Sequence, residues 1–385
     1  MRADGGGGYR AAMLATALLL AAMSADPAAN APASATNDPG PIPVYLGTNA
    51  DGVYRTTLDP ATGRLSEPTR AAEIARPGFL AAHPSGKKLY AVTEGTSVTE
   101  LTVQADGSLA ETGESAVAPG GAKAGPCHVD VMPGGGAVIA ANYGGGSVSS
   151  FPLSADGTLG ERAGFVQHEG SSVDPKRQTA PHAHCSTPAP GGRFAVFADL
   201  GLDKLFVYAV DAKTGALTEH SETDTPPGGG PRHVAFTPDG RFAYCCLEMG
   251  NEILALDWDG DAGTLTARGT LSTLPDDWTG GGTTAEVRVH PGGKFVYVTN
   301  RGHDSVAVYR IDDDGSLTLV EITPATVKIP RGMNLTPDGR FLIACGQNSD
   351  DVVSFAVDAN TGRLTPTGSR VTAPKPIDAL PLPTR

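Results

Sequence analysis

The sequence predicts an all-β fold, a seven-bladed β-propeller, and three observations support this prediction. An apolar segment, a Pro with a Gly-bearing turn, and a second apolar segment recur together six times, at intervals of 46–57 residues. Each copy continues into an alternating segment and a Gly-x-Leu turn, and the chain ends contain the parts of one more copy. A β-rich unit of about 40–50 residues is typical of propeller blades. The prolines that mark the six copies are Pro84, Pro133, Pro190, Pro238, Pro291 and Pro337.

Each copy is expected to form four strands, named A to D from the central channel outwards. Strand A precedes the marker proline, strand B follows it, strand C is the alternating segment, and strand D begins at the Gly-x-Leu turn. The segment Pro43–Pro68 has strands B, C and D but no A, and the tail Ala373–Pro383 resembles an A strand alone. Pairing this C-terminal innermost strand with the N-terminal strands gives a seventh blade and closes the ring, which removes exposed sheet edges.

The N-terminus has the pattern of a secretory signal, with a basic start, the apolar run Ala11–Met23 and small residues after it. The run is short for a membrane span, although a retained membrane anchor is the alternative. We therefore expect a signal peptide and spacer over residues 1–35, a linker over 36–42 and the propeller domain over 43–385. This organisation predicts an exported protein, periplasmic or extracellular, that is not stably inserted in a membrane after signal cleavage.

The bulk composition narrows the range of partners. The formal net charge is −13, from 29 basic and 42 acidic residues, which argues against nucleic acid because phosphate binding needs a basic face. The five cysteines include no CxxC pair, and their odd number and their positions inside the repeats favour core packing over a disulfide framework. No His/Asp cluster has metal-ligand spacing, so we expect no metal and no cofactor. We expect a monomer or small homo-oligomer that binds a small molecule.

The repeats differ most at two positions that should meet at one mouth of the channel, the start of strand A and the end of strand B. Six residues before the marker prolines stand Gly78, Cys127, His184, Arg232, Ala285 and Arg331. Ten residues after them stand Glu94, Tyr143, Leu200, Glu248, Arg301 and Gln347. Several ionisable residue types that converge on one concave site favour a binding or catalytic role. The alternative is that charged strand ends are simply hydrated, and that Arg232 and Glu248 pair across their hairpin.

Two further candidates, Arg177 and His182, lie in the longest connection between repeats, His168–His184, which we expect to fold over the mouth. These groups suit acyl-oxygen chemistry on an anionic, sugar-like compound, because Arg binds carboxylate or phosphate bidentately and stabilises an oxyanion. A His or Glu beside the Arg can act as general base on water or as general acid on the leaving alkoxide. Since no GxSxG elbow is present, direct attack by water is the simpler mechanism.

Longer segments resemble the seven-bladed propeller lactonase family, whose named activity is 6-phosphogluconolactonase and which includes the fungal carboxy-muconate lactonizing enzymes. The resemblance rests on ANYGGGSV from Ala141, GGPRHVAFTPDGRFAY from Gly229, the PHAH segment and NRGHDS from Asn300, and it covers about Pro43 to the C-terminus. It implies four catalytic residues, His184, Arg232, Glu248 and Arg301. As substrate-binding residues we predict His182, Arg177, Arg331, Glu94, Gln347 and His303.

From the residues and the resemblance together, we expect hydrolysis of a sugar-acid lactone to the open hydroxy acid. His184 or Glu248 would activate water, while Arg232 and Arg301 would hold the anionic group and the developing oxyanion. A phosphorylated lactone is a cytosolic compound, so the expected export leaves the choice of lactone open. Two alternatives also stay open, a muconate-type lactonizing lyase and a non-catalytic exported propeller that binds a ligand or a protein.

Overall fold

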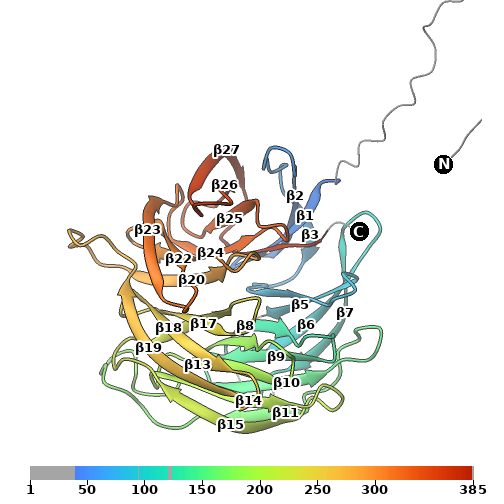
Figure 1. The fold of residues 1–385 in the computed structure, drawn as a ribbon. Helices are drawn as coiled ribbons and strands as arrows, with labels where there is room; N and C mark the ends of the chain where they lie inside the picture. Colours follow the sequence, from blue (N-terminus) through green and yellow to red (C-terminus); the bar gives the residue numbers. More distant parts are fainter. Residues whose placement is uncertain (1–39, 94, 120–123, 384–385) are drawn as a thin grey trace, which may run out of the picture. The chain divides into compact units, whose positions relative to one another are not determined.

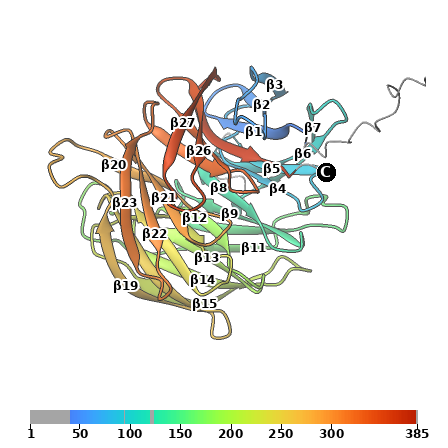
Figure 2. The same ribbon diagram turned by 45° about the horizontal axis from the view of Figure 1, so that its top comes forward.

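The computed structural model describes residues 40–93, 95–119 and 124–383. In this part of the chain twenty-eight β-strands form seven four-stranded antiparallel sheets arranged around a common hub (Figures 1 and 2). The sheets are the blades of a propeller, as the sequence predicts. Nowhere in the described ranges is there a helix of sufficient length and apolarity to cross a bilayer.

The blades are numbered along the chain, and blade 7 is the one that closes the ring. Blade 1 contains β4 (Leu80–Ala82), β5 (Lys88–Thr93), β6 (Ser97–Val103) and β7 (Leu109–Ala116). Blade 2 contains β8 (Pro126–Val131), β9 (Ala137–Asn142), β10 (Ser147–Pro152) and β11 (Gly164–Gln167). Blade 3 contains β12 (Ala183–Pro188), β13 (Phe194–Asp199), β14 (Lys204–Val210) and β15 (Leu217–Asp224). Blade 4 contains β16 (Pro231–Phe236), β17 (Phe242–Leu247), β18 (Glu252–Asp259) and β19 (Thr264–Ser272). Blade 5 contains β20 (Thr283–Val289), β21 (Phe295–Arg301), β22 (Ser305–Ile311) and β23 (Leu317–Pro324). Blade 6 contains β24 (Pro330–Leu335), β25 (Phe341–Gly346), β26 (Asp351–Val357) and β27 (Leu364–Thr372). Blade 7 contains β28 (Pro376–Pro381), β1 (Ile42–Thr48), β2 (Gly52–Leu58) and β3 (Thr69–Glu73).

Blade 7 joins the two ends of the described chain. Its strand order is β28-β1-β2-β3, so the C-terminal strand is innermost and pairs antiparallel with β1, with Ala379 opposite Leu46. Figures 1 and 2 show the blue strands β1–β3 beside the red strands of blade 6. The predicted ring closure is therefore confirmed, and β1 begins one residue before the predicted start of the propeller. The predicted signal peptide and spacer (1–35) and most of the predicted linker (36–42) lie outside the described residues.

A repeated hydrogen bond between blades explains two features of the sequence motif, the Tyr in strand B and the Gly-x-Leu turn before strand D. The hydroxyl of Tyr45 donates to the carbonyl oxygen of Gly107 in the next blade at 2.9 Å, and Tyr244 donates to Gly315 at the same distance. The contact recurs in two further pairs of neighbouring blades. Each bond satisfies a buried hydroxyl, while apolar side chains of facing sheets fill the rest of the space. The motif therefore fastens each of these blades to its neighbour.

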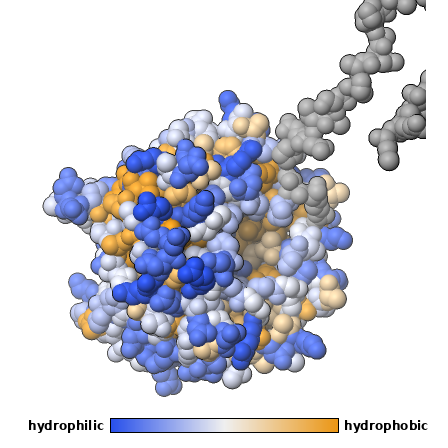
Figure 3. Space-filling model, in the orientation of Figure 1, coloured by the Kyte–Doolittle hydropathy of each residue, from blue (hydrophilic) through white to orange (hydrophobic). Residues whose placement is uncertain are grey.

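The inner strands of the blades converge on the hub. Figure 3 shows that the face seen in Figure 1 is largely hydrophilic and is hollowed near the middle of the ring. The residues at the ends of the inner strands therefore decide what can bind in the hub.

Candidate active site

A β-bulge at the start of the inner strand sets the geometry of the hub. In blade 3, Ala183 and Cys185 pair with consecutive residues of β13, so His184 is the extra residue between them. Arg232 is placed in the same way at the start of β16. Bulges redirect side chains and are common beside active sites. The bulged residues of four other blades are Cys127, Ala285 with Glu286, Arg331 and Ile377.

These strand starts and the ends of the second strands surround a cavity of about 610 Å³, a size that suits a small molecule. Six of the ten predicted site residues line it: His184, Glu248, Arg301, Arg177, Arg331 and Gln347. Arg177 reaches the cavity from the connection before β12, as expected for a segment that folds over the mouth. The buried side chain of Gln178 anchors this connection by donating to the carbonyl oxygen of Leu200 at 2.9 Å.

Glu248 is the centre of an ion network. Its Oε1 accepts from Nη2 of Arg177 at 2.8 Å, while its Oε2 lies 2.9 Å from Nε of Arg232 and 2.9 Å from Nη2 of Arg301. Burial alone would raise the pKa of Glu248, but the charges of Arg232 and Arg301 outweigh it and hold this pKa well below its ordinary value. Glu248 is therefore ionised at neutral pH, and its two oxygens are both occupied in fixing three guanidinium groups.

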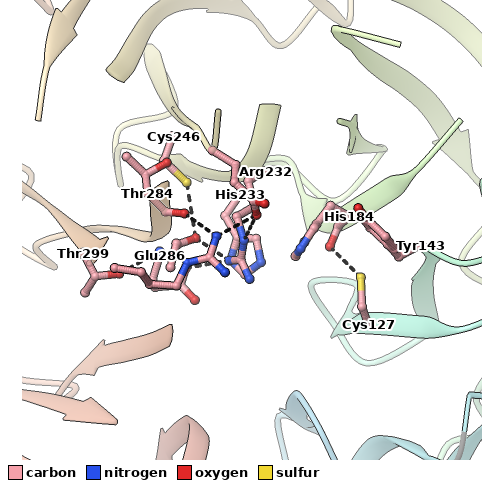
Figure 4. A network of polar contacts seen from close by, with 12 residues as sticks. Cys127, Tyr143, His184, Arg232, His233, Cys246, Thr284, Glu286 and Thr299 are labelled. Atoms are coloured by element: carbon pink, nitrogen blue, oxygen red, sulfur yellow. Dashed lines mark hydrogen bonds and ion pairs between the residues drawn. The ribbon is translucent and has the colours of Figure 1, made fainter. Parts of the chain in front are cut away.

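His184 lies in the cavity wall with a neutral imidazole. Burial, together with the positive charge of Arg232, holds the pKa of His184 well below its ordinary value. Its ring meets Tyr143 edge to face at a centroid distance of 5.4 Å, and within the described residues its Nδ1 has no hydrogen-bond partner. Figure 4 shows the ring facing the side chains of Arg232 and His233 of the neighbouring blade, and the centroids of the His184 and His233 rings lie 5.3 Å apart. A neutral imidazole at this place has a lone pair with which to accept a proton.

Arg331 differs from the other arginines because no described residue pairs with its guanidinium group, and its Nε is enclosed without a hydrogen bond. Burial and the nearby charges of Arg232 and Arg301 lower its pKa to about 10, so it remains protonated at neutral pH. Gln347, from the end of β25, lines the same cavity. This side of the cavity therefore holds a positive charge that the described protein does not neutralise.

Three of the remaining predicted residues, Arg232, His182 and His303, are not part of the cavity lining. Arg232 has no exposed surface, which corrects the expectation that it touches an anion directly; it lies behind Glu248 and donates through Nη1 to the carbonyl oxygen of Ala285. His182 stacks on Tyr143 at 4.5 Å, and its Nδ1 lies 2.9 Å from the Tyr143 carbonyl oxygen.

His303 also stands apart from the cavity. Its ring packs against Trp278 at 4.6 Å, and its Nδ1 lies 2.7 Å from Oγ of Ser305. Glu94 lies outside the described residues.

Blade 7 contributes cavity residues that the sequence comparison missed. Asn49 follows β1, Arg76 follows β3, and Ile377 starts β28, and all three line the cavity. Asn49 and Ile377 occupy the same two positions that were compared in the other blades. Because this blade is split between the chain ends, it has no marker proline from which to count. Aligning its strands B and A separately with the other copies would have found both residues.

A second polar layer lies in the hub wall. His233 Nδ1 is 2.9 Å from Oε1 of Glu286, and Arg288 Nε is 3.5 Å from the same oxygen. Burial raises the pKa of Glu286, and it raises the pKa of Asp378 to about 7. Figure 4 shows that Glu286 and His233 belong to the same polar network as Arg232. None of these four residues lines the cavity, so they support the site from behind.

Comparison with known proteins identifies the family to which this fold belongs. A family model described as "Lactonase, 7-bladed beta-propeller" matches residues 42–381. The chain belongs to this lactonase family. The family resemblance seen in the sequence is therefore confirmed. In this member of the family, no group of three His, Cys, Asp or Glu side chains among the described residues is placed to hold a metal ion.

Several lactonase relatives match most of the chain. A 6-phosphogluconolactonase of Bacillus subtilis is 34% identical over 345 residues, which cover 88% of this chain and 96% of the relative. A 6-phosphogluconolactonase of Pectobacterium carotovorum is 31% identical over 287 residues, which cover 74% of this chain and 81% of the relative. Among solved structures, the periplasmic gluconolactonase of Pseudomonas aeruginosa matches with a TM-score of 0.82 at 28% identity, over 90% of this chain and 100% of that chain.

Proposed function

We propose that the protein hydrolyses the lactone of a sugar acid to the open hydroxy acid. One observation carries the proposal: neutral His184 and the guanidinium group of Arg301 line the same cavity, and Glu248 fixes the guanidinium group at 2.9 Å. Membership of the lactonase family and the names of the relatives from Bacillus subtilis and Pseudomonas aeruginosa support the same reaction.

In the proposed mechanism, His184 accepts a proton from water as the water oxygen attacks the lactone carbonyl carbon. Negative charge then develops on the carbonyl oxygen, where the guanidinium groups of Arg301 and Arg177 stabilise it. The bond between the carbonyl carbon and the ring oxygen breaks, and His184 returns the proton to the departing alkoxide. Glu248 keeps the two guanidinium groups in place, a role that suits a carboxylate whose two oxygens both already accept from guanidinium groups. Water and lactone thus become one hydroxy acid.

We further propose that the protein is exported and that its N-terminal segment is a cleaved signal peptide. The apolar run Ala11–Met23 after a basic start supports this, as does the periplasmic location named for the Pseudomonas aeruginosa relative. Expression of the full gene product, followed by cell fractionation and N-terminal sequencing of the mature protein, tests the proposal. A protein that stays in the cytosol with its first residues intact would contradict it.

Lactone turnover tests the catalytic proposal. The purified protein is assayed by pH-stat with a panel of sugar-acid lactones, with subtraction of the enzyme-free rate because lactones open spontaneously. We expect Arg301→Lys to lower kcat/KM by about 10²–10³-fold, since an ammonium group cannot reproduce the fixed fork. We expect His184→Asn to lower it by about 10²–10⁴-fold. The exposed Arg310→Lys and His220→Asn are the matched controls.

Two outcomes would count against the proposal, the first against hydrolysis itself and the second against the assigned catalytic residues. One is a wild-type rate that equals the enzyme-free rate with every lactone. The other is full activity in both the Arg301→Lys and His184→Asn proteins. Turnover of a muconate in place of a lactone would favour the lactonizing alternative, and a bound sugar acid without turnover would favour a binding role.

A further inference from the structure

The cavity is a positive region in an acidic protein. Four arginines line it (Arg76, Arg177, Arg301 and Arg331), and Glu248 is the one carboxylate among the described lining residues. The whole chain, by contrast, has a formal net charge of −13. A concave site with an excess of fixed positive charge favours anionic ligands.

The four guanidinium groups are not equivalent. Arg177 and Arg301 are bound to the carboxylate of Glu248. Arg331 has no ion pair or hydrogen bond to any described residue, and its enclosed Nε lacks a partner. A partly enclosed guanidinium group whose Nε lacks a partner is favourably placed to receive a group with negative charge. The unneutralised charge therefore lies on the side of Arg331.

Arg76 is an exposed residue that lines the same cavity, and its local backbone structure is unusual. Its φ is 50°, a left-handed conformation that a non-glycine residue seldom adopts, and its backbone N–H donates to the carbonyl oxygen of Ala50 at 2.8 Å. Its Nε donates to Oδ1 of Asn49 at 3.0 Å. Because an amide oxygen carries no charge, Asn49 orients the guanidinium group without neutralising it. The two terminal nitrogens of Arg76 stay available to a ligand.

The ring places Asn49 and Arg76 on the side of the hub away from Glu248, with Arg331 between them and Arg301. Glu248 belongs to blade 4 and Asn49 to blade 7, three positions apart, which is the largest separation in a ring of seven. Arg76 follows β3 of blade 7, and Arg331 starts the inner strand of blade 6. The unpaired guanidinium groups therefore form one side of the cavity, and His184 with the Glu248 network forms the other.

We propose that Arg331 and Arg76 form a subsite for an anionic substituent of the substrate, a phosphate or a carboxylate remote from the lactone carbonyl. This inference rests on the proposed lactone hydrolysis and adds an orientation to it: the anionic substituent points toward blades 6 and 7, and the carbonyl points toward blades 3 to 5. Guanidinium groups bind both kinds of oxyanion bidentately, so the shared feature is the negative charge. Asn49 is a positioning residue that acts through Arg76.

Binding measurements with the open acids test the subsite without any need for turnover. Gluconate, glucarate and 6-phosphogluconate differ only at the sixth carbon, which carries a hydroxymethyl, a carboxylate or a phosphate group. We expect the wild-type protein to bind at least one of the two anionic forms about 10- to 100-fold more tightly than gluconate by titration calorimetry. The form with the larger advantage identifies the natural substituent. Equal binding of all three would overturn the subsite.

Single substitutions test which residues cause the preference for anionic ligands. Arg331→Gln should remove most of the advantage of the anionic ligand and leave gluconate binding within about twofold, while Arg331→Lys should keep part of it because the charge remains. Arg76→Gln should act in the same direction, and Asn49→Ala more weakly. The exposed Arg340→Gln in the same blade as Arg331 is the control, and thermal melting checks that each variant is folded. An equal loss for gluconate and for the anionic ligand in Arg331→Gln would indicate a purely structural role and overturn the proposal.

Kinetic measurements distinguish a failure of this proposal from a failure of the proposed lactone hydrolysis. With the matching lactones, Arg331→Gln should raise KM for the anionic substrate about 10- to 100-fold and leave kcat nearly unchanged. Selective binding of the anionic acids without turnover of any lactone would refute the hydrolase and uphold the subsite. Turnover of all lactones with no preference for negative charge would do the reverse.

Discussion

The substitution Glu248→Gln tests the ion network at the centre of the hub. In the wild-type protein the carboxylate lies within 2.9 Å of three guanidinium groups, and the side chain of Arg232 has no exposed surface. Glutamine keeps the volume of the side chain but removes its charge. Arg232 is then left as a buried cation with no anionic partner, and its acceptors are the carbonyl oxygen of Ala285 and at best the single amide oxygen of the new glutamine. The nearby cation Arg301 adds repulsion.

The expected loss of stability is large because one partner of a buried pair is removed. Breaking a buried ion pair in this way costs about 3–5 kcal/mol, and the similar volume of Gln adds no cavity cost. Arg177→Gln is the matched control: it removes a partner of the same carboxylate from a side chain that is 41% exposed, where about 0–1 kcal/mol is expected. Urea unfolding followed by circular dichroism measures both. Replacing Arg232 by Met in the Glu248→Gln background should recover part of the loss, since it removes the uncompensated charge.

The pH dependence supplies a second, independent readout. The folded-state pKa of Glu248 lies below its unfolded value, so its contribution is fully present above the unfolded pKa and is lost as the pH falls through the folded pKa. The stability difference between wild type and Glu248→Gln should therefore be constant between about pH 5 and 8 and shrink below about pH 4. A variant within about 1 kcal/mol of wild type at pH 7, or a difference that grows on acidification, would refute the network.

Three further predictions concern the scaffold. Gly332→Ala should lower stability by about 1–3 kcal/mol in thermal melting, because its Cβ would lie 2.1 Å from the carbonyl oxygen of Ile377, whereas Gly281→Ala, with nothing within 4 Å, should not. The five cysteines form no disulfide, and burial raises the pKa of the partly exposed Cys127 to about 12. A thiol reagent should therefore titrate the five thiols only after denaturation. Rapid reaction of the folded protein with the reagent would contradict this prediction. A chain that ends before β28 should lose cooperative unfolding and aggregate, because β1 then becomes an exposed sheet edge. A truncated protein that is soluble and unfolds cooperatively would show that ring closure is dispensable.

Much of the fold could be predicted because each blade repeats the same local chemistry. The Gly-x-Leu turn and the Tyr of strand B recur since the Tyr hydroxyl must reach the turn of the next blade, as Tyr45 reaches Gly107. The same regularity made the exceptional residues visible. His184 stands at the start of strand A in blade 3, whereas Glu248 and Arg301 stand at the end of strand B in blades 4 and 5, and the structure brings all three to one cavity.

The sequence could not predict which side chains point into the cavity. Counting by twos along a strand puts His182 and His184 on the same face, but the bulge at His184 interrupts this alternation, and His182 turns to stack on Tyr143. Nor could it predict which arginines stay unpaired, because that depends on distances across the ring. Arg232 was expected either to pair with Glu248 or to hold an anion, and the structure shows the pair.

The bulges and the ion network together explain how the hub holds so much charge. A bulge adds one residue at the same level of six inner strands, so side chains from different blades converge without any strand losing its ladder. The carboxylate of Glu248 neutralises part of the charge and fixes Arg301, while Arg331 in the neighbouring blade is left unpaired among the described residues. If the carboxylate were absent, the guanidinium groups would repel one another and spread. One buried anion therefore makes one side of the cavity rigid and leaves the other side able to accept an anionic ligand.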